Sequence, residues 1–268
     1  MKKHSIALLL LLVLLTGCGA KTEEAPWQTA YRETGKYLQE QDALSAGSVG
    51  GEWAVIGLSR AGLLSDETAQ SYEQTVEDYV KQAGSVRLHH AKSTENSRAI
   101  LGLTAAGYNA ANMAGVDLTA GLTDMAYLRA QGTNGPIWAL IALDCHGYDI
   151  PQCADGEEQT TCEGLVAEIL SYQCSDGGWA LMGDESDVDM TAMALTSLAP
   201  YQEETDIKAA VDAPLTYLSD AQQADGGFMS WGAANSESCA QVIVALTALG
   251  IDSAADSRFV IRSSILFV

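Results

Sequence analysis

The sequence has few basic residues for its length. Fourteen Lys and Arg stand against 35 Asp and Glu among 268 residues, so the formal net charge is −21 at pH 7. A surface with this excess of acids repels the phosphates of nucleic acids and of anionic lipid headgroups. We therefore expect no nucleic acid among the partners of this protein.

Patterns that bind metal are also lacking. The six cysteines include no Cys-x-x-Cys pair, and His89 and His90 have no further ligand close in sequence. Zinc sites need such ligands at short spacings. The sequence therefore predicts no metal site and no cofactor.

Long apolar runs are restricted to the N-terminus. Lys2 and Lys3 precede an apolar stretch from Ile6 to Leu15, which is too short to span a bilayer as a mature helix. The following Leu-Thr-Gly-Cys sequence resembles the lipobox of bacterial lipoproteins. This resemblance implies a signal peptide over 1–17, lipidation of Cys18 and a linker over 18–26. The protein would then be exported and held at the cell membrane by its lipid, facing outside the cytoplasm; an ordinary secretory signal with an incidental cysteine is the alternative.

Five short segments share one pattern and recur every 40 to 52 residues. Each closes an apolar run, and four of them end in a glycine that suits a left-handed helix C-cap. The segments are 57–62, 102–107, 142–147, 194–199 and 245–250. A repeat at this spacing is typical of a helical array in which each unit is too small to bury its own apolar face. We therefore predict an all-α fold.

The predicted helices are of two alternating kinds. Helices such as 66–83 and 205–221 have one apolar stripe, whereas helices such as 189–199 and 238–249 are apolar on every side. A helix that is apolar all round requires burial on both sides, so we expect these helices to line the interior and the others to wrap them. The predicted pairs are 27–41 with 52–62, 66–83 with 93–106, 118–131 with 135–146, 161–173 with 186–199, and 205–223 with 236–249. An eleventh segment begins near Arg258.

Two of the loops between paired helices share the pattern Gln-x-x-x-Gly-Gly-aromatic, and the loop that starts at Gln131 is a weaker copy. Glycine permits a tight turn, the aromatic ring can cover the turn, and the glutamine can satisfy loose backbone groups at the helix end. This predicts a structural role for six residues. They are Gln173, Gly177, Trp179, Gln222, Gly226 and Phe228.

These loops resemble the Gln–Trp repeats of the squalene–hopene cyclase and protein prenyltransferase superfamily. The resemblance covers roughly 27–268 and implies an α/α toroid, also described as an α6/α6 barrel. Six helical pairs would close such a ring, so we expect the last pair to be incomplete and the toroid to be truncated at the C-terminus.

A second resemblance bears on catalysis. Asp187-Val-Asp-Met-Thr-Ala192 is similar to the Asp-Val-Asp-Asp-Thr-Ala stretch of triterpene cyclases, which implies Asp189 as the general acid and Asp187 as its helper. Met190 replaces the next acid of that motif. Cyclases also line their cavities with aromatic rings that stabilise carbocations, and this chain has three Phe, five Trp and ten Tyr.

Single-domain toroids also occur in secreted bacterial proteins and in the cobalamin carriers intrinsic factor and transcobalamin. By this analogy of fold, our first functional hypothesis is a ligand- or partner-binding module rather than an enzyme. The alternatives are a squalene-type cyclase or mutase that uses Asp189, and a glycan-active enzyme of the α/α-barrel type.

Acidic residues begin four of the predicted inner helices, and alternation of helix direction would place them on one rim of a toroid. One interpretation is electrostatic, because acids in a first turn favour the helix dipole and Ser186 with Asp189, Ser93 or Ser236 can form caps. The other is a polar rim that binds a small molecule or a protein. The residues predicted to bind at this rim are Glu52, Trp53, Glu95, Arg98, Trp138 and Glu237.

Overall fold

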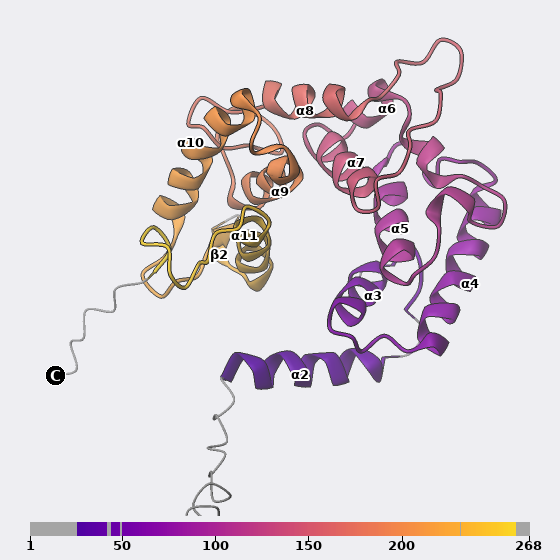
Figure 1. Ribbon diagram of the computed structural model, residues 1–268, viewed down its shortest axis with the longest axis horizontal. Helices are drawn as coiled ribbons and strands as arrows, with labels where there is room; N and C mark the ends of the chain where they lie inside the picture. Colours follow the sequence, from indigo (N-terminus) through magenta and orange to yellow (C-terminus); the bar gives the residue numbers. More distant parts are fainter. Residues whose placement is uncertain (1–25, 42–43, 49, 231, 261–268) are drawn as a thin grey trace, which may run out of the picture. The chain divides into compact units, whose positions relative to one another are not determined.

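The computed structural model describes residues 26–41, 44–48, 50–230 and 232–260 (Figure 1). The predicted signal peptide over 1–17, Cys18 and the linker as far as residue 25 lie outside the described residues. The described part is almost entirely helical, with a single two-stranded sheet, so the predicted all-α class is confirmed. No helix in the described ranges has both the length and the hydropathy needed to cross a membrane.

The chain divides into two compact units, residues 1–40 and residues 41–268. In the first unit the structure describes α2 (Pro26–Gln39). Its aromatic side chains are largely exposed, with Trp27 at 67% and Tyr37 at 61% of their full accessibility.

The second unit holds the remaining helices. They are α3 (Gly51–Arg60), α4 (Asp66–Ala83), α5 (Thr94–Ala105), α6 (Met125–Arg129), α7 (Asn134–Asp144), α8 (Cys162–Ser171), α9 (Val188–Leu198), α10 (Thr205–Ala221) and α11 (Ser236–Ala248). Short 3-10 helices are η1 (Ala110–Asn112), η2 (Leu118–Leu122) and η3 (Ala199–Tyr201), and β1 (Met229–Ser230) pairs with β2 (Ala233–Ala234) in antiparallel fashion.

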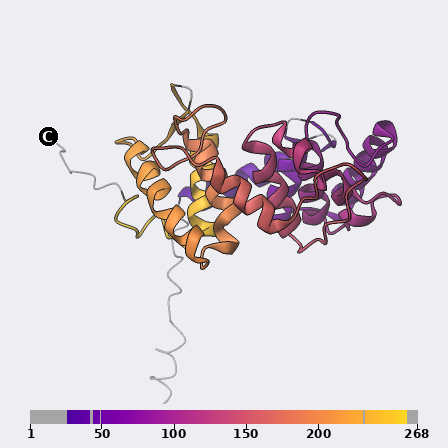
Figure 2. The same ribbon diagram turned by 90° about the horizontal axis from the view of Figure 1, so that it is seen from above.

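Alternate helices of the second unit pack on one another in succession. Helix α3 packs on α5, α5 on α7, α7 on α9, and α9 on α11, as can be followed in Figures 1 and 2. Helix α8 packs against α7 and α10 against α9. Helix α4 buries a single stripe of apolar side chains, among them Tyr72 and Val76. Alternate helices therefore form one packed succession, to which α8 and α10 are added at α7 and α9.

The glycines predicted to end helices are confirmed as left-handed caps. The φ angles of Gly62, Gly107, Gly147 and Gly250 are 67°, 88°, 63° and 73°. The fourth repeat segment, 194–199, ends in Ala199 instead, and there the chain continues into η3 rather than reversing through a left-handed residue. Glycine therefore stands where the backbone needs a positive φ angle.

The predicted helix over 118–131 is wrong, because the chain forms η2 and α6 with a break at Thr123 and Asp124. The backbone at this break is bonded to a distant loop: Thr160 N donates to Thr123 O at 2.8 Å, and Met125 N donates to Glu158 O at 2.8 Å. The Asp124 side chain then accepts from Ala126 N and starts α6. Tertiary pairing here overrides the helical pattern of the sequence.

The prediction that every apolar inner helix is buried on both sides is also wrong. Helix α7 is buried on nearly every side, but α11 leaves Ile243 and Val244 at 56% and 50% exposure. The main helical packing partners of α11 in the described residues are α9 and η3. Ile243 and Val244 thus lie on an exposed face of α11.

Candidate functional site

A pocket of about 520 Å³ lies at the N-terminal ends of α3, α5 and α7. Its volume falls within the range of roughly 300–1,000 Å³ that is typical of small-molecule sites. We call it the Trp53–Trp138 pocket. Its lining consists of Gly47, Trp53, Lys92, Thr94, Glu95, Arg98, Gln131, Asn134 and Trp138. Four of the six residues predicted to bind at a rim, Trp53, Glu95, Arg98 and Trp138, therefore line one cavity.

Two indole rings form the aromatic part of this pocket. The ring centroids of Trp53 and Trp138 are 5.2 Å apart, and the ring planes are inclined at 57°. Both α3 and α7 pack on α5, and the early turns of all three helices meet at this pocket. Trp53 is 43% exposed, so its ring is open to a ligand.

A guanidinium between two carboxylates forms the polar part. Arg98 Nη2 lies 2.6 Å from Glu95 Oε2, and Arg98 Nη1 lies 4.0 Å from Glu52 Oε2. Glu52 Oε1 accepts from Gly47 N at 2.6 Å, and the residue is only 1% exposed. A buried carboxylate needs partners of this kind. The Gly47 amide satisfies Oε1, whereas Oε2 has only the longer ion pair with Arg98 and no hydrogen-bond partner in the described structure.

Two tyrosines stand behind these charges. The Tyr79 hydroxyl donates to Glu95 Oε2 at 3.4 Å. Burial raises the pKa of Tyr79, and the neighbouring Glu95 carboxylate raises it further. Burial, followed by the charge of Glu52, also raises the pKa of Tyr72, whose buried hydroxyl has no hydrogen-bond partner in the described structure. Both phenols therefore remain neutral donors around neutral pH.

The amide side of the pocket comes from two residues that the sequence did not single out as ligand-binding. Gln131 Oε1 accepts from Thr94 N and from Ser93 Oγ, each at 3.0 Å. Ser93 is the N-cap residue of α5, but its side chain makes no capping hydrogen bond. The side chain of Gln131 takes that role because it reaches the free amide of Thr94 in the first turn. Asn134 lines the pocket, but its Oδ1 is buried and has no hydrogen-bond partner in the described structure.

Glu237 does not line the Trp53–Trp138 pocket. It is exposed in the first turn of α11, where Ser236 Oγ donates to its Oε2 at 3.4 Å. The predicted cap by Ser236 is also wrong: Asn235 Oδ1 accepts from Ser238 N at 2.6 Å and caps α11.

Asp187 and Asp189 lie at the start of α9, away from this pocket. Asp187 is the N-cap itself, with Oδ1 accepting from Met190 N at 2.7 Å and Oδ2 accepting from Leu181 N at 3.3 Å. The predicted capping box of Ser186 with Asp189 is wrong, since Ser186 Oγ donates to Asp176 instead. Burial raises the pKa of Asp187, although its backbone hydrogen bonds act in the opposite direction.

The cavity beside Asp187 has no aromatic lining, although Tyr217 is close and donates its hydroxyl to Ser186 O at 2.7 Å. The cavity measures about 290 Å³ and is lined by Ala180, Leu181, Met182, Glu185, Ser186 and Asp187. The nearest repeat aromatic, Trp179, is fully buried and donates Nε1 to Ile169 O at 2.7 Å. Its indole belongs to the core, and Asp189 does not line this cavity.

The two repeat turns share one hydrogen-bond pattern. Gln173 Nε2 donates to Gly177 O at 2.7 Å, and Gln222 Nε2 donates to Gly226 O at 3.2 Å. Gly177 and Gly226 have φ angles of 93° and 91°. The aromatic residues that follow, Trp179 and Phe228, are 0% and 4% exposed.

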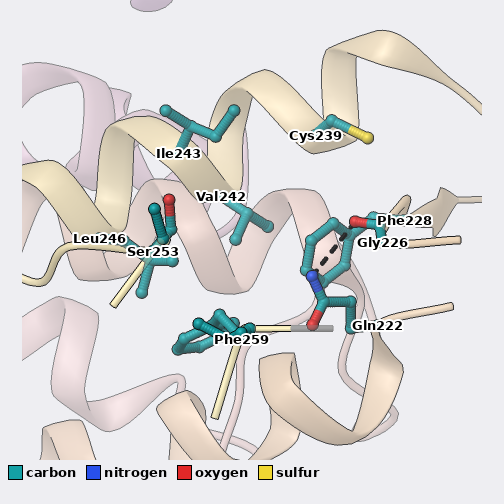
Figure 3. A pocket seen from close by; sticks show the side chains of 11 residues that line it. Gln222, Gly226, Phe228, Cys239, Val242, Ile243, Leu246, Ser253 and Phe259 are labelled. Carbon is teal, nitrogen blue, oxygen red and sulfur yellow. Dashed lines mark hydrogen bonds between the residues drawn. The ribbon is translucent and has the colours of Figure 1, made fainter. Parts of the chain in front are cut away.

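A second cavity of about 350 Å³ adjoins the Gln222 turn (Figure 3). Phe228, Val242, Leu246 and Phe259 give it a mainly apolar wall, and the amide of Gln222 turns to the carbonyl of Gly226. Polar groups that could orient a ligand do not converge here, in contrast to the Trp53–Trp138 pocket.

Metal-ligating residues do not cluster in the part of the chain that the structure describes. No group of three or more His, Cys, Asp or Glu side chains there could hold a metal ion. Cys145, Cys153, Cys162, Cys174 and Cys239 are free thiols.

Comparisons of the chain with protein-family models, with curated proteins and with solved structures found no match. The functional argument therefore depends on the geometry of the Trp53–Trp138 pocket. The sequence indicated Trp53, Glu95, Arg98 and Trp138 because they lie in the early turns of apolar helices. It marked Gln131 only as the start of a repeat loop, and it gave no comparable signal for Lys92, Thr94 or Asn134, which are ordinary polar residues of loops and helix starts.

Proposed function

We propose that this protein is a ligand-binding module and that its ligand lies in the Trp53–Trp138 pocket. The observation that carries the proposal is the convergence of an accessible indole pair with a fixed Glu95–Arg98 ion pair in one cavity. Apolar walls with a few oriented polar groups are the usual composition of a small-ligand site.

The proposal also covers the architecture of the fold, an α/α toroid, and the location of the protein at the outer face of the cell membrane. The succession of inner helices from α3 to α11, covered by outer helices, supports an α/α toroid of the cyclase and prenyltransferase type. The lipobox around Cys18 supports export and attachment to the outer face of the cell membrane by a lipid. The pocket would then meet ligands outside the cytoplasm.

A glycan hydrolase is less well supported by the same residues. Such an enzyme needs one carboxyl group that gives a proton and a second that faces the anomeric carbon or a water. In this pocket the carboxylates of Glu95 and Glu52 both lie near the guanidinium of Arg98. Glu52 is only 1% exposed, and its Oε1 accepts a hydrogen bond from the Gly47 amide. Neither arrangement leaves a carboxylate pair free to flank a bond of the substrate.

A cyclase is also less well supported. Both oxygens of Asp187 accept backbone hydrogen bonds at the start of α9, and the adjacent cavity has no aromatic lining. A carbocation needs aromatic faces around the acid, and the indole pair of this protein lies in a different pocket.

Binding can be tested with the lipid-free mature chain. We expect a saturable rise in melting temperature, with a change in tryptophan emission, for one or more members of a panel of sugars, nucleosides, amino acids, choline and corrinoids. Trp53→Ala should abolish that response, because Trp53 supplies the exposed indole. Trp27→Ala is the matched control, since Trp27 is 67% exposed in the separate first unit. A panel without any response, or a response that Trp53→Ala leaves intact, would refute the proposal.

A further inference from the structure

The chemistry of the Trp53–Trp138 pocket restricts the class of ligand. Resting on the function proposed above, we infer that the ligand is a neutral sugar, a pyranose ring or a short chain of such rings. A pyranose has one face of C–H groups and a periphery of hydroxyls. It therefore needs an aromatic surface on one side and paired polar groups on the other.

The aromatic requirement is met by the indole pair. The 57° inclination of the two ring planes prevents face-to-face stacking of Trp53 on Trp138. The exposed Trp53 ring, at 43% accessibility, can therefore receive the C–H face of a sugar while Trp138 forms an adjoining wall. Burying this indole surface provides the apolar part of the binding energy.

The charge of the pocket argues against an ionic ligand. Its titratable lining residues are Lys92, Glu95 and Arg98, with Glu52 behind Arg98. Two basic and two acidic groups thus balance. A quaternary ammonium ion would suit the indoles but would lie beside Arg98 and Lys92, and an anion would lie beside Glu95 in a chain of net charge −21. A neutral ligand meets neither repulsion.

The polar groups match hydroxyls that both donate and accept. Asn134 Oδ1 is buried and lacks a partner, so it requires a donor that the described protein does not provide. Leaving such an acceptor unsatisfied costs about 1–3 kcal/mol. Because Asn134 lines the pocket, a rotation of its amide would bring this acceptor to a sugar hydroxyl, which can donate to it and accept from a neighbouring group. An apolar ligand would leave the acceptor unsatisfied.

The fixed ion pair adds specificity. Glu95 presents a carboxylate and Arg98 a planar guanidinium, held 2.6 Å apart by their hydrogen bond. Vicinal hydroxyls of a pyranose can donate to a carboxylate and accept from a guanidinium side by side. Because the pair is already assembled, binding does not need to order it.

The test is titration calorimetry of the lipid-free mature chain with neutral sugars. The probes are glucose, galactose, mannose, N-acetylglucosamine and their β-linked disaccharides. Sorbitol is the matched control, because it keeps the hydroxyls of glucose but has no ring face to stack on an indole. We expect saturable binding of at least one cyclic sugar, none of sorbitol, and an affinity that changes less than about twofold between 0.05 and 0.5 M NaCl, since screening weakens ionic contacts.

Variants identify the contacts. Trp53→Ala should weaken sugar binding at least about tenfold, and Trp53→Phe should recover part of the loss because it restores an aromatic face. Asn134→Ala should weaken binding about fivefold to tenfold through loss of the hydroxyl contact, with Trp27→Ala unchanged. Circular dichroism and melting temperature verify that each variant is folded.

The outcomes separate this inference from the proposed function. If choline, a nucleoside or an amino acid binds in a Trp53-dependent manner and no sugar does, the pocket is a binding site and the sugar inference is wrong. If sugars bind but Trp53→Ala and Asn134→Ala leave the affinity unchanged, the site lies elsewhere and both statements are wrong. If no probe binds, both are likewise overturned.

Discussion

Gln173 and Ala210 are joined by a hydrogen bond of 2.9 Å from the side-chain Nε2 to the backbone carbonyl. The same Nε2 donates to Gly177 O at 2.7 Å. One glutamine therefore connects its own Gly-Gly turn to the outer helix α10. Gln222, the corresponding residue of the next repeat, donates only to Gly226 O in the described structure, at 3.2 Å.

This difference predicts unequal stability losses at the two repeat positions. Gln173→Leu should lower the free energy of unfolding by about 2–3 kcal/mol, because it leaves two backbone carbonyls without their donor, and Gln222→Leu by about 1 kcal/mol. Urea unfolding followed by circular dichroism measures both. Gln223→Leu is the control, since Gln223 donates from an exposed position to Ala221 O. Equal losses for Gln173→Leu and Gln222→Leu would show that the contact with α10 contributes nothing.

The turn glycines allow backbone strain to be separated from steric clash. A Cβ at Gly177 would lie 2.6 Å from Ala213 Cβ, whereas a Cβ at Gly147 would meet no atom within 4 Å. Both residues have positive φ angles, 93° and 63°. Gly147→Ala should therefore destabilise the protein by about 1–2 kcal/mol through strain alone, and Gly177→Ala by more, because α10 must shift as well. Unfolding curves in urea check this, and a loss at Gly147 equal to that at Gly177 would contradict it.

Much of the helical framework could be predicted because its signals are local. A glycine at positive φ ends four of the repeat segments. In α7 and α9 apolar residues occur all round the helix, and buried residues are found on most sides of both helices. The break at Thr123 and Asp124 could not be predicted, because it depends on hydrogen bonds with residues 158–160, which are distant in sequence.

The candidate site could be predicted in part for the same reason. Trp53, Arg98 and Trp138 lie in early turns of inner helices, so the common direction of these helices brings them together. Glu237 also lies in the first turn of its helix, α11, but it does not line the pocket, which lies among α3, α5 and α7. The repeat pattern predicts that a glutamine such as Gln131 satisfies backbone groups at a helix end, but not that it does so for Thr94 at the start of α5. The role of Asn134 depends on the buried space that its side chain meets, and the sequence does not carry this information.

The contact between α6 and α8 predicts a dependence of stability on pH. Arg129 Nε lies 2.8 Å from Glu168 Oε1, and this hydrogen bond lowers the pKa of Glu168 below its ordinary value. A carboxyl group with a lowered pKa in the folded state stabilises the fold above its unfolded pKa, and this stabilisation is lost as the pH falls through the folded pKa. Glu168→Gln should thus lower the stability at pH 7 by less than about 1 kcal/mol, because Arg129 is partly exposed.

The matched control is Glu158→Gln, since Glu158 contacts the same arginine but is 53% exposed. Its effect should be smaller at every pH. Thermal unfolding between about pH 3 and pH 7 makes the comparison, and the deficit of Glu168→Gln should shrink towards the acidic end. A deficit that is constant with pH would show that lost packing, and not charge, is responsible.

Asp187 gives the opposite sign of pH dependence. Burial raises the pKa of Asp187, so the folded chain holds this proton more tightly than the unfolded chain. The contribution of this carboxyl group to the free energy of unfolding is therefore largest below its unfolded pKa of about 3.9. It falls as the pH rises from that value through the raised pKa of the folded state. Asp187→Asn keeps an acceptor for Met190 N but does not ionise. Its stability relative to the unsubstituted chain should increase over that range of pH and then remain constant.

Asp187→Ala removes the cap and should cost about 1 kcal/mol even at the acidic end of the range. Asp189→Asn serves as the control, because Asp189 accepts neither of the backbone bonds that Asp187 accepts. Chemical denaturation at steps of pH from about 3.5 to 7 gives the three curves. If Asp187 acts as a cap and not as a catalytic acid, both asparagine variants should also leave ligand binding at the Trp53–Trp138 pocket unchanged. Conversion of squalene by the unsubstituted chain, lost in Asp189→Asn but not in Trp53→Ala, would instead place the activity at the start of α9.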